Sequence, residues 1–354
     1  MFNNILIAYG LDPAVCEIHK LDSGLINYTW KITTQDKEFI LQQINSNVFK
    51  SPGDIAQNLE ILNNYIKKVD PDYLFVAPLL SPNGSSIVQT ESGSYFRLFP
   101  FIKNSHTVNT VENAGEAYEA AKQFGTFTRL FKGLDLSLLN YTLTDFHNLP
   151  LRIEQFNQAC KQAEPGRLET AKDVIDTINR YSNITLTYEN LVNNALIPLR
   201  VIHHDTKISN VLFDDTNKGL CVIDLDTVMP GYFISDVGDM MRTYLSPANE
   251  EEQDFSKITV RHEFFYAIYK GYIEQMEGIL TPAEKENFIF AGKFMIYMQA
   301  TRFITDYLNN DIYYQVKYSG HNLMRARNQL YFLDEYIKAE PQLTELMKHQ
   351  YSSI

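Results

Sequence analysis

The sequence is poor in cysteine: its three thiols, Cys16, Cys160 and Cys221, are widely spaced and form no CxxC pair. This excludes a disulfide-stapled scaffold and a cysteine-based zinc site. No apolar run approaches the roughly 18 residues that a membrane-spanning helix needs. The first basic residue is Lys20, and the only apolar stretch before it, 5–9, is too short for a secretory signal. We therefore expect a soluble, cytoplasmic protein without a membrane partner.

Basic residues are also scarce. The 31 Lys and Arg face 43 Asp and Glu, which leaves a formal net charge of −12. Because nucleic-acid-binding proteins normally present a basic face, this balance excludes a general nucleic-acid binder. With 45% hydrophobic and 21% charged residues, the chain is typical of globular proteins. Its 354 residues suffice for one large or two linked domains, and no obligate protein partner is evident.

The first hundred residues are rich in predicted strands. β-Branched and aromatic segments predict strands over 25–32 and 38–44, and an apolar period of 3.6 residues predicts a helix after Ser51. Three further strands are expected, at 73–80, 87–89 and 95–101, with Pro82–Gly84 as a hairpin turn. The pattern predicts a small antiparallel sheet that carries one helix.

From about Val111 the period becomes helical. Helices are expected within 114–125, 153–160, 168–181, 261–277, 283–308 and 323–338. The segment 199–230 interrupts them with two short apolar runs, and the acidic run Glu250–Glu252 is predicted to be a solvated loop. The chain is therefore predicted to be α+β, with a sheet lobe of about 100 residues before a mostly helical lobe.

The segment 201–213 carries the chemical signal. It holds His203, Asp205, Lys207 and Asn210 in the pattern HxDxKxxN, and Asp224 follows at the end of the next apolar run. Phosphoryl transfer needs a carboxylate for the acceptor hydroxyl, a cation for the γ-phosphoryl group, and an Asn with an Asp for magnesium. An Asp that caps a turn and an Asn that satisfies a loop are the structural alternative. The combined spacing favours the catalytic interpretation.

This loop resembles the catalytic loop of protein kinases. The number of residues between this loop and Asp224, and the Ile before Asp224, are more similar to the pattern in the aminoglycoside phosphotransferase and choline kinase group. Four longer phrases resemble N-acetylhexosamine 1-kinases and their bacterial relatives: 39–50, 97–102, 145–148 and 302–308. The resemblance implies a two-lobe protein-kinase-like fold, with a small antiparallel-sheet N-lobe over 1–102 and a larger, mostly helical C-lobe over 103–354. The nucleotide is then expected in the cleft between the lobes.

The resemblance also implies roles for single residues. Asp205 matches the general base, and Lys207 matches the phosphate-facing lysine. Asn210 and Asp224 match the magnesium ligands, with Asp226 as a second candidate ligand. ATP is the implied phosphoryl donor, with Mg²⁺ bound.

Nucleotide contacts and structural residues follow in the same way. The implied nucleotide contacts are the residues Ser23, Gly24, Asn27 and Gln43 and the backbone of Pro100, Phe101 and Ile102. The implied structural residues are His203 and Asp236, and Asp236 braces the catalytic loop. The third strand departs from the family because it presents Gln42 and Gln43 where a cation is usual. Lys31 or Lys50 are candidate substitutes, and Glu60 is the candidate partner on the helix.

A neutral sugar is bound by polar groups at its hydroxyls and by aromatic faces at its C–H surface. The resemblance implies an Arg and a Tyr near the C-terminus, which Arg302 and Tyr313 fit. Asp306 and His147 are further candidates for substrate contact. The alternatives are a helix ion pair between Arg302 and Asp306 and an interior histidine at 147.

The sequence therefore favours a kinase that transfers the γ-phosphate of Mg-ATP to a sugar hydroxyl, most of all the anomeric hydroxyl of an N-acetylhexosamine. Two alternatives remain open. One is a kinase for another small alcohol: an aminoglycoside, choline or homoserine. The other is a catalytically silent nucleotide- or sugar-binding protein, which the absent third-strand cation favours. A serine hydrolase is excluded because the chain has no Gly-x-Ser-x-Gly turn.

Overall fold

The computed structural model describes residues 2–21 and 26–351 and groups the chain into two compact units. The first unit consists of residues 1–106, 130–144 and 212–230; the second consists of 107–129, 145–211 and 231–354. The two later segments of the first unit lie far from it in the sequence, where local periodicity carries no information about their packing. The predicted division into functional lobes, 1–102 and 103–354, stays a prediction.

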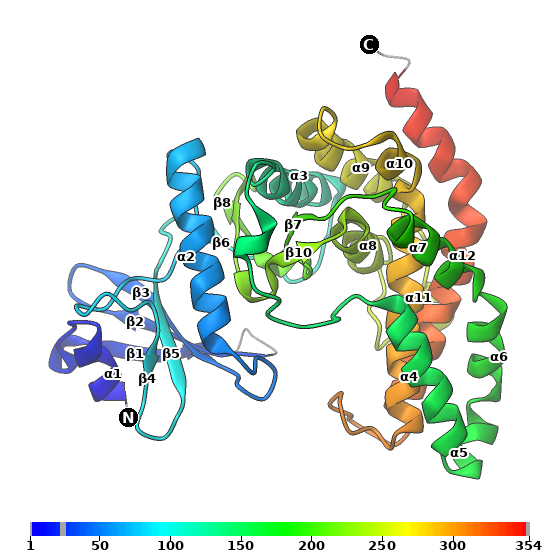
Figure 1. Ribbon diagram of the computed structural model, residues 1–354, viewed down its shortest axis with the longest axis horizontal. Helices are drawn as coiled ribbons and strands as arrows, with labels where there is room; N and C mark the ends of the chain where they lie inside the picture. The colour runs from blue at the N-terminus through cyan, green and yellow to red at the C-terminus, as the bar shows by residue number, and fades with distance from the viewer. Residues whose placement is uncertain (1, 22–25, 352–354) are drawn as a thin grey trace. The chain divides into compact units, whose positions relative to one another are not determined.

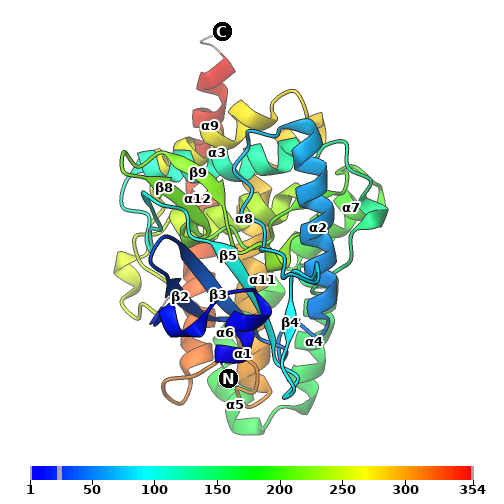
Figure 2. The same cartoon turned by 90° about the vertical axis from the view of Figure 1, so that its left-hand side faces the viewer.

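The first unit contains a five-stranded antiparallel sheet in the order β1-β2-β3-β5-β4 (Figure 2). Its strands are β1 (Glu17–Leu21), β2 (Tyr28–Thr33), β3 (Glu38–Ile44), β4 (Val88–Gln89) and β5 (Tyr95–Pro100). The short helix α1 (Phe2–Ala8) packs Ile5 and Leu6 on one face, against a core that includes Leu41 and Phe96. Because side chains alternate along a strand, their sequence neighbours point to the opposite face.

A second, three-stranded sheet and a long helix complete the first unit. The sheet has the order β6-β8-β9, from Ser105–His106, Val211–Asp214 and Gly219–Val222. Helix α2 (Pro52–Val69) begins with Pro52 in its first turn, where a missing N–H costs nothing. Its buried Asn58 donates to the carbonyl oxygens of Asn140 (2.9 Å) and Val228 (3.1 Å), which fixes both later segments of the unit.

The second unit is mostly helical. Its elements are α3 (Ala114–Leu130), α4 (Leu149–Gln162), α5 (Pro165–Thr170), α6 (Lys172–Arg180), α7 (Asn183–Asn193), β7 (Arg200–Ile202), α8 (Phe233–Tyr244), α9 (His262–Met276), α10 (Pro282–Glu286), α11 (Phe288–Leu308) and α12 (His321–Tyr351), and β10 (Met229–Gly231) ends at its boundary. Helix α11 runs beside α12, α8 and α4 (Figure 1). The α8–α11 contact is very close, because a Cβ on Gly238 would lie 2.3 Å from the carbonyl oxygen of Ala291.

The α+β class is confirmed, with an antiparallel sheet in the N-terminal region and a larger helical part. The strand predicted at 73–80 is wrong: this segment is irregular, and Pro78 within it has no N–H for a ladder. The N-terminal region carries α1 as well as the one expected helix. Helices α7 and α8 were not predicted; α8 is buried on nearly all sides, although Phe233, Val237, Met240 and Tyr244 recur in it at helical spacing. Among the described residues, no helix is both long and apolar enough to span a membrane.

Candidate active site

In the second unit, the predicted catalytic loop follows strand β7 and is held at its start by helix α8. The Asp236 carboxylate accepts the backbone N–H groups of His203 (2.8 Å) and His204 (2.7 Å). His203 is fully buried and meets the ring of Phe124 edge-on, with centroids 5.2 Å apart. Burial raises the pKa of Asp236 to about 6, and His203 with the two N–H donors opposes that rise. Both predicted structural residues thus lie at the base of the loop.

A second carboxylate of α8, not predicted from the sequence, holds the next residue of the loop. Asp239 accepts the backbone N–H of Thr206 at 2.9 Å and pairs with Arg242 at 3.0 Å. Tyr244 donates to the carbonyl oxygen of Thr206 at 2.5 Å. Burial raises the pKa of Asp239, and the Arg242 guanidinium opposes it. The spacing of Asp236 and Asp239, three residues apart on one helix face, was the available signal.

The loop brings three predicted residues together. The Lys207 Nζ lies 3.0 Å from Oδ2 of Asp205, whose side chain is 21% exposed. The Asn210 amide nitrogen donates to the backbone oxygen of Asp205 at 2.9 Å, so its amide oxygen is the atom that remains to bind a cation. His204, just before Asp205, has a left-handed φ of 67°, a conformation that is uncommon for non-glycine residues.

In the first unit, the predicted metal segment follows strand β9. Asp224 also has a left-handed backbone, with φ 59° and ψ 56°, at the start of a 3-10 turn over Leu225–Thr227. The carboxylate of Asp224 and the amide oxygen of Asn210 are hard oxygen ligands of the kind that Mg²⁺ prefers. Asp226 is only 2% exposed, and both of its oxygens have partners: Arg97 at Oδ1 and Asn27 at Oδ2. A metal-binding role for Asp226 stays a prediction.

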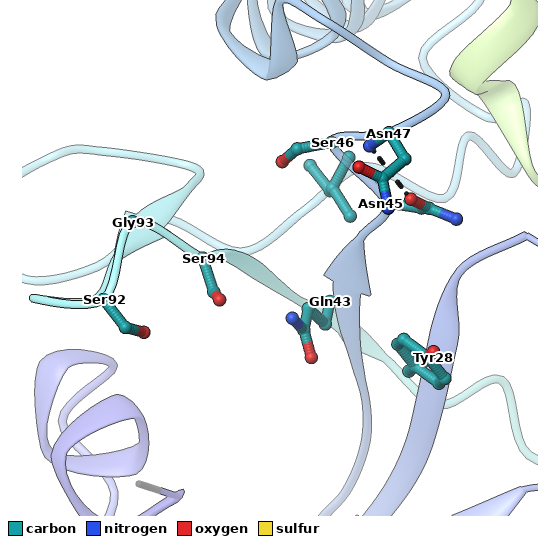
Figure 3. Close-up of a pocket in the computed structure, with 9 residues that line it drawn as sticks. Tyr28, Gln43, Asn45, Ser46, Asn47, Ser92, Gly93 and Ser94 are labelled. Carbon is teal, nitrogen blue, oxygen red and sulfur yellow. Dashed lines mark hydrogen bonds between the residues drawn. The ribbon is translucent and has the colours of Figure 1, made fainter.

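The predicted nucleotide contacts lie in several places. Ser23 and Gly24 fall outside the described residues. Asn27 donates to Asp226 at 2.7 Å and accepts the N–H of Asn45 at 3.0 Å. Gln43 points away from Gln42 and lines a surface hollow of about 260 Å³ with Tyr28 and Ser94 (Figure 3).

The backbone of 100–102 is partly engaged. Phe101 donates its N–H to the carbonyl oxygen of Glu38 at 3.1 Å, and Ile102 accepts the Ser105 hydroxyl at 2.7 Å. Pro100 ends strand β5 and has no N–H to offer. Adenine contact by these residues stays a prediction.

Of the candidate substitutes for the third-strand cation, Lys31 pairs with Glu38 at 2.6 Å and lies 4.1 Å above the Phe101 ring. Lys50 is exposed, as is Glu60 on α2.

The candidate acceptor region lies in the second unit, around Arg302 of α11. Its guanidinium stands over three rings, 5.5 Å from the centroids of Phe146 and Tyr314 and 5.9 Å from that of Tyr313. It also donates to the side-chain oxygen of Gln299 at 3.2 Å. Among the described residues, no carboxylate pairs with Arg302, so the alternative of a helix ion pair with Asp306 is wrong.

His147 connects this region to the catalytic loop. Its ring stacks on Phe146 with centroids 4.3 Å apart and lies 5.3 Å from the ring of His204. Burial lowers the pKa of His147 well below its ordinary value, and His204, Arg302 and Arg152 lower it further. The imidazole is therefore neutral near pH 7. Within the described part of the chain, its Nδ1 atom has no hydrogen-bond partner.

Asp306 orders the aromatic segment. Its two oxygens accept the backbone N–H groups of Tyr313 (2.8 Å) and Tyr314 (2.9 Å), and Asn322 donates to it at 2.9 Å. Direct contact of Asp306 with a substrate stays a prediction. Phe146 and Tyr314 were missed because only the folded chain places them beside Arg302.

The acidic run Glu250–Glu252 lies in a loop, as expected, and its side chains are 28–32% exposed and paired with cations. Glu250 pairs with Arg242 at 3.0 Å, and Glu252 pairs with Lys257 at 3.1 Å. Glu251 pairs with Arg325 at 2.7 Å. These pairs compensate the charge of the run.

Comparison with known proteins agrees with this geometry. Residues 17–257 match the family described as phosphotransferase enzyme family. The chain belongs to this family. The sequence resemblance is therefore confirmed at the level of the phosphotransferase superfamily, and the protein is a small-molecule phosphotransferase of this type.

Several solved structures share the fold of this phosphotransferase. A microcompartment-associated aminopropanol kinase has a TM-score of 0.67 at 13% identity, covering 96% of this chain and 97% of that chain. A spectinomycin phosphotransferase solved with ADP and spectinomycin has a TM-score of 0.59 at 13% identity, with the same coverage of 96% and 97%. Choline kinase from Cryptosporidium parvum has a TM-score of 0.57 at 14% identity, covering 96% of both chains.

Proposed function

We propose that this phosphotransferase transfers the γ-phosphoryl group of ATP to the anomeric hydroxyl of an N-acetylhexosamine. The observation that carries the choice of acceptor is the group of cations and aromatic rings that adjoins the catalytic loop at His204. ATP as donor is supported by the family match and by the ADP in the related spectinomycin phosphotransferase.

The catalytic loop supplies the groups for the transfer. Asp205 accepts a hydrogen bond from the acceptor hydroxyl and finally its proton as the oxygen attacks phosphorus. Lys207, 3.0 Å from Asp205, balances the negative charge on the transferred group. Asn210 and Asp224 would hold Mg²⁺, which neutralises charge on the triphosphate when bound.

The electrostatics of the acceptor region favour a neutral molecule. Burial lowers the pKa of Arg152, and the neighbouring charge of Arg302 lowers it further. Arg302 itself contacts ring faces and an amide. The Coulomb repulsion between one guanidinium and an ammonium group about 5 Å away would weaken binding by about 3 kcal/mol at an effective dielectric constant of about 20. The carboxylates that would compensate are engaged: Asp306 holds backbone N–H groups, and the 250–252 run pairs with cations. Choline, aminoglycosides and aminopropanol all carry such an ammonium group.

A sugar with an acetamido group suits these residues. Arg302 is a fork of donors for hydroxyl and carbonyl oxygens. The exposed ring of Tyr313 offers a face for the C–H surface of the pyranose. The choice of the anomeric hydroxyl rests on the resemblance of 97–102 and 302–308 to sugar 1-kinases, and this hydroxyl is the most acidic one on a reducing sugar.

The test is ADP release from Mg-ATP across a panel of acceptors: N-acetylglucosamine, N-acetylgalactosamine, glucose, homoserine, choline, aminopropanol and kanamycin. We expect kcat/KM for an N-acetylhexosamine to exceed that for each ammonium-bearing acceptor by about 100-fold or more, the factor that corresponds to about 3 kcal/mol. Turnover of amino alcohols alone would replace this proposal by its rival. If none of the acceptors on the panel gives ADP release, the proposal is replaced by the silent binding protein.

The variant Asp205→Asn tests the base. It should lower kcat by about 100- to 10,000-fold while the circular dichroism spectrum stays unchanged. Asp215→Asn is the matched control, because Asp215 is exposed in the turn after β8. An Asp205→Asn enzyme with normal kcat would remove Asp205 from the mechanism.

A further inference from the structure

The sheet of the first unit has a buried cation that the third strand does not supply. In the antiparallel register, Thr29 of β2, Gln42 of β3 and Arg97 of β5 lie directly opposite one another in one row. Leu41 and Phe96, one residue away, belong to the core on the other face. The row Thr29-Gln42-Arg97 is therefore a polar line across the face that does not pack on α1.

Arg97 is the cation of this line and is only 1% exposed. Its Nε and Nη2 atoms both donate to the side-chain oxygen of Gln42, at 3.1 and 2.9 Å. Its Nη1 atom donates to Oδ1 of Asp226 in a buried ion pair. A planar guanidinium makes such a fork of bonds, and a lysine ammonium cannot reproduce it.

Asp226 links this cation to the segment that carries Asp224. The second oxygen of Asp226 accepts the Asn27 amide at 2.7 Å, and the Asn27 oxygen in turn accepts the N–H of Asn45. Strand β5, the residue before β2 and the residue after β3 are thus all tied to one carboxylate two residues after Asp224.

The partners found in protein kinases are absent from their usual elements. There a lysine on the third strand pairs with a glutamate on the helix of the small lobe. Here β3 presents Gln42, and α2 turns the neutral Asn58 inward onto the backbone of Val228 while Glu60 is exposed. Lys31 is engaged by Glu38.

We propose that Arg97 replaces the third-strand cation as a positioning residue. Through Asp226 it fixes the segment that holds Asp224, and Asp226 serves as the counter-charge of Arg97 rather than as a magnesium ligand. This inference rests on the proposed function, because it assigns Asp224 to the Mg-nucleotide. Its physical basis is burial: a guanidinium that is 1% exposed and has three of its five N–H donors engaged acts on the nucleotide through the groups it holds.

The test measures Mg-ADP binding to the full chain by titration calorimetry, with a parallel titration in EDTA to isolate the metal-dependent part. The variants are Arg97→Gln, Asp226→Asn and the double substitution. Each single variant leaves one buried charge without its partner, so Mg-ADP affinity should fall by about 10-fold or more. The double variant buries no charge and keeps amides in both places, so its affinity should return to within about 3-fold of the wild type.

Two further variants separate positioning from simple loss of structure. Gln42→Ala removes the acceptor of two Arg97 bonds without creating an unpaired charge. It should weaken Mg-ADP binding by about 3- to 10-fold, measured well below the thermal midpoint, which the unsatisfied donors also lower. Lys37→Gln removes an exposed cation from the turn between β2 and β3 of the same sheet and should leave the affinity unchanged.

The results distinguish this inference from the proposed function. If Asp226 is itself a magnesium ligand, the double variant will bind Mg-ADP no better than Asp226→Asn, and the inference is overturned. A Gln42→Ala chain with wild-type affinity also overturns it. A wild-type chain that binds no Mg-ADP removes the proposed function and this inference together.

Discussion

Replacing Gly238 by alanine is expected to disturb the catalytic loop from a distance. Gly238 lies on α8, between the two carboxylates that hold the loop, and faces α11. An added Cβ would lie 2.3 Å from the carbonyl oxygen of Ala291 and 2.9 Å from Cβ of Met295. Because ordinary contacts begin near 3.4 Å, the two helices must separate locally by about 1 Å.

That displacement exceeds the change in length that the affected hydrogen bonds can tolerate. Asp236 and Asp239 hold the loop at 2.7 to 2.9 Å, and a lengthening of about 1 Å takes these contacts beyond hydrogen-bond range. Overpacking costs about 1–3 kcal/mol, and the better helix propensity of alanine returns up to about 1 kcal/mol. We expect a net loss of about 1–2 kcal/mol in the free energy of unfolding and a fall in kcat of about 10- to 100-fold.

The assay pairs thermal unfolding, followed by circular dichroism at 222 nm, with ADP release at saturating substrates. Circular dichroism is the better probe because the single tryptophan, Trp30, lies in the sheet of the first unit. The control is Gly271→Ala, whose Cβ would lie 2.3 Å from the Tyr118 carbonyl oxygen, between α9 and α3. It carries a similar clash away from Asp236 and Asp239. If both variants lose stability and kcat equally, α8 does not position the loop and the reasoning is refuted.

Two further predictions concern groups beside the loop. A Cβ on Gly231 would lie 2.3 Å from Nε2 of His204, so Gly231→Ala should cost about 1–3 kcal/mol of stability and lower kcat. The control is Gly53→Ala, because a Cβ on Gly53 meets nothing within 4 Å. Equal kcat values for the two variants would contradict the prediction. Burial lowers the pKa of His147, so the unfolded chain binds the proton first and stability is lost as the pH falls below about 6.5. In urea titrations, the excess stability of the wild type over His147→Gln should therefore be about 1 kcal/mol larger at pH 7.5 than at pH 5.5, and a gap independent of pH would count against a buried neutral imidazole.

The sequence alone predicts the elements that local pattern controls. Strands β2 and β3 and helix α2 follow from alternation and from a 3.6-residue period, and the HxDxKxxN spacing locates the loop from His203 to Asn210. Helix α8 was not predicted although Phe233, Val237, Met240 and Tyr244 recur at helical spacing; its burial on nearly all sides is a property of the folded chain. Asp239 was missed because the residue it holds, Thr206, lies 33 residues earlier in the sequence.

Contacts between distant segments are the second limit. Arg97 and Asp226 are 129 residues apart in sequence, and nothing in either neighbourhood indicates their ion pair. Gln42 and Gln43 on strand β3 show a related limit, and nucleotide contact by Gln43 stays a prediction. Period-two alternation separates the two side chains to opposite faces, but only the core formed with α1 identifies which face is which.

Phosphorus NMR of the reaction product tests the central claim most directly. The enzyme is incubated with Mg-ATP and N-acetylglucosamine or N-acetylgalactosamine, and the new phosphomonoester signal is examined for coupling to sugar protons. We predict a single product whose phosphorus couples to the anomeric proton, formed by the wild type at least about 100-fold faster than by Asp205→Asn. A signal coupled to the C6 protons, or product from amino alcohols but from neither sugar, would contradict the account.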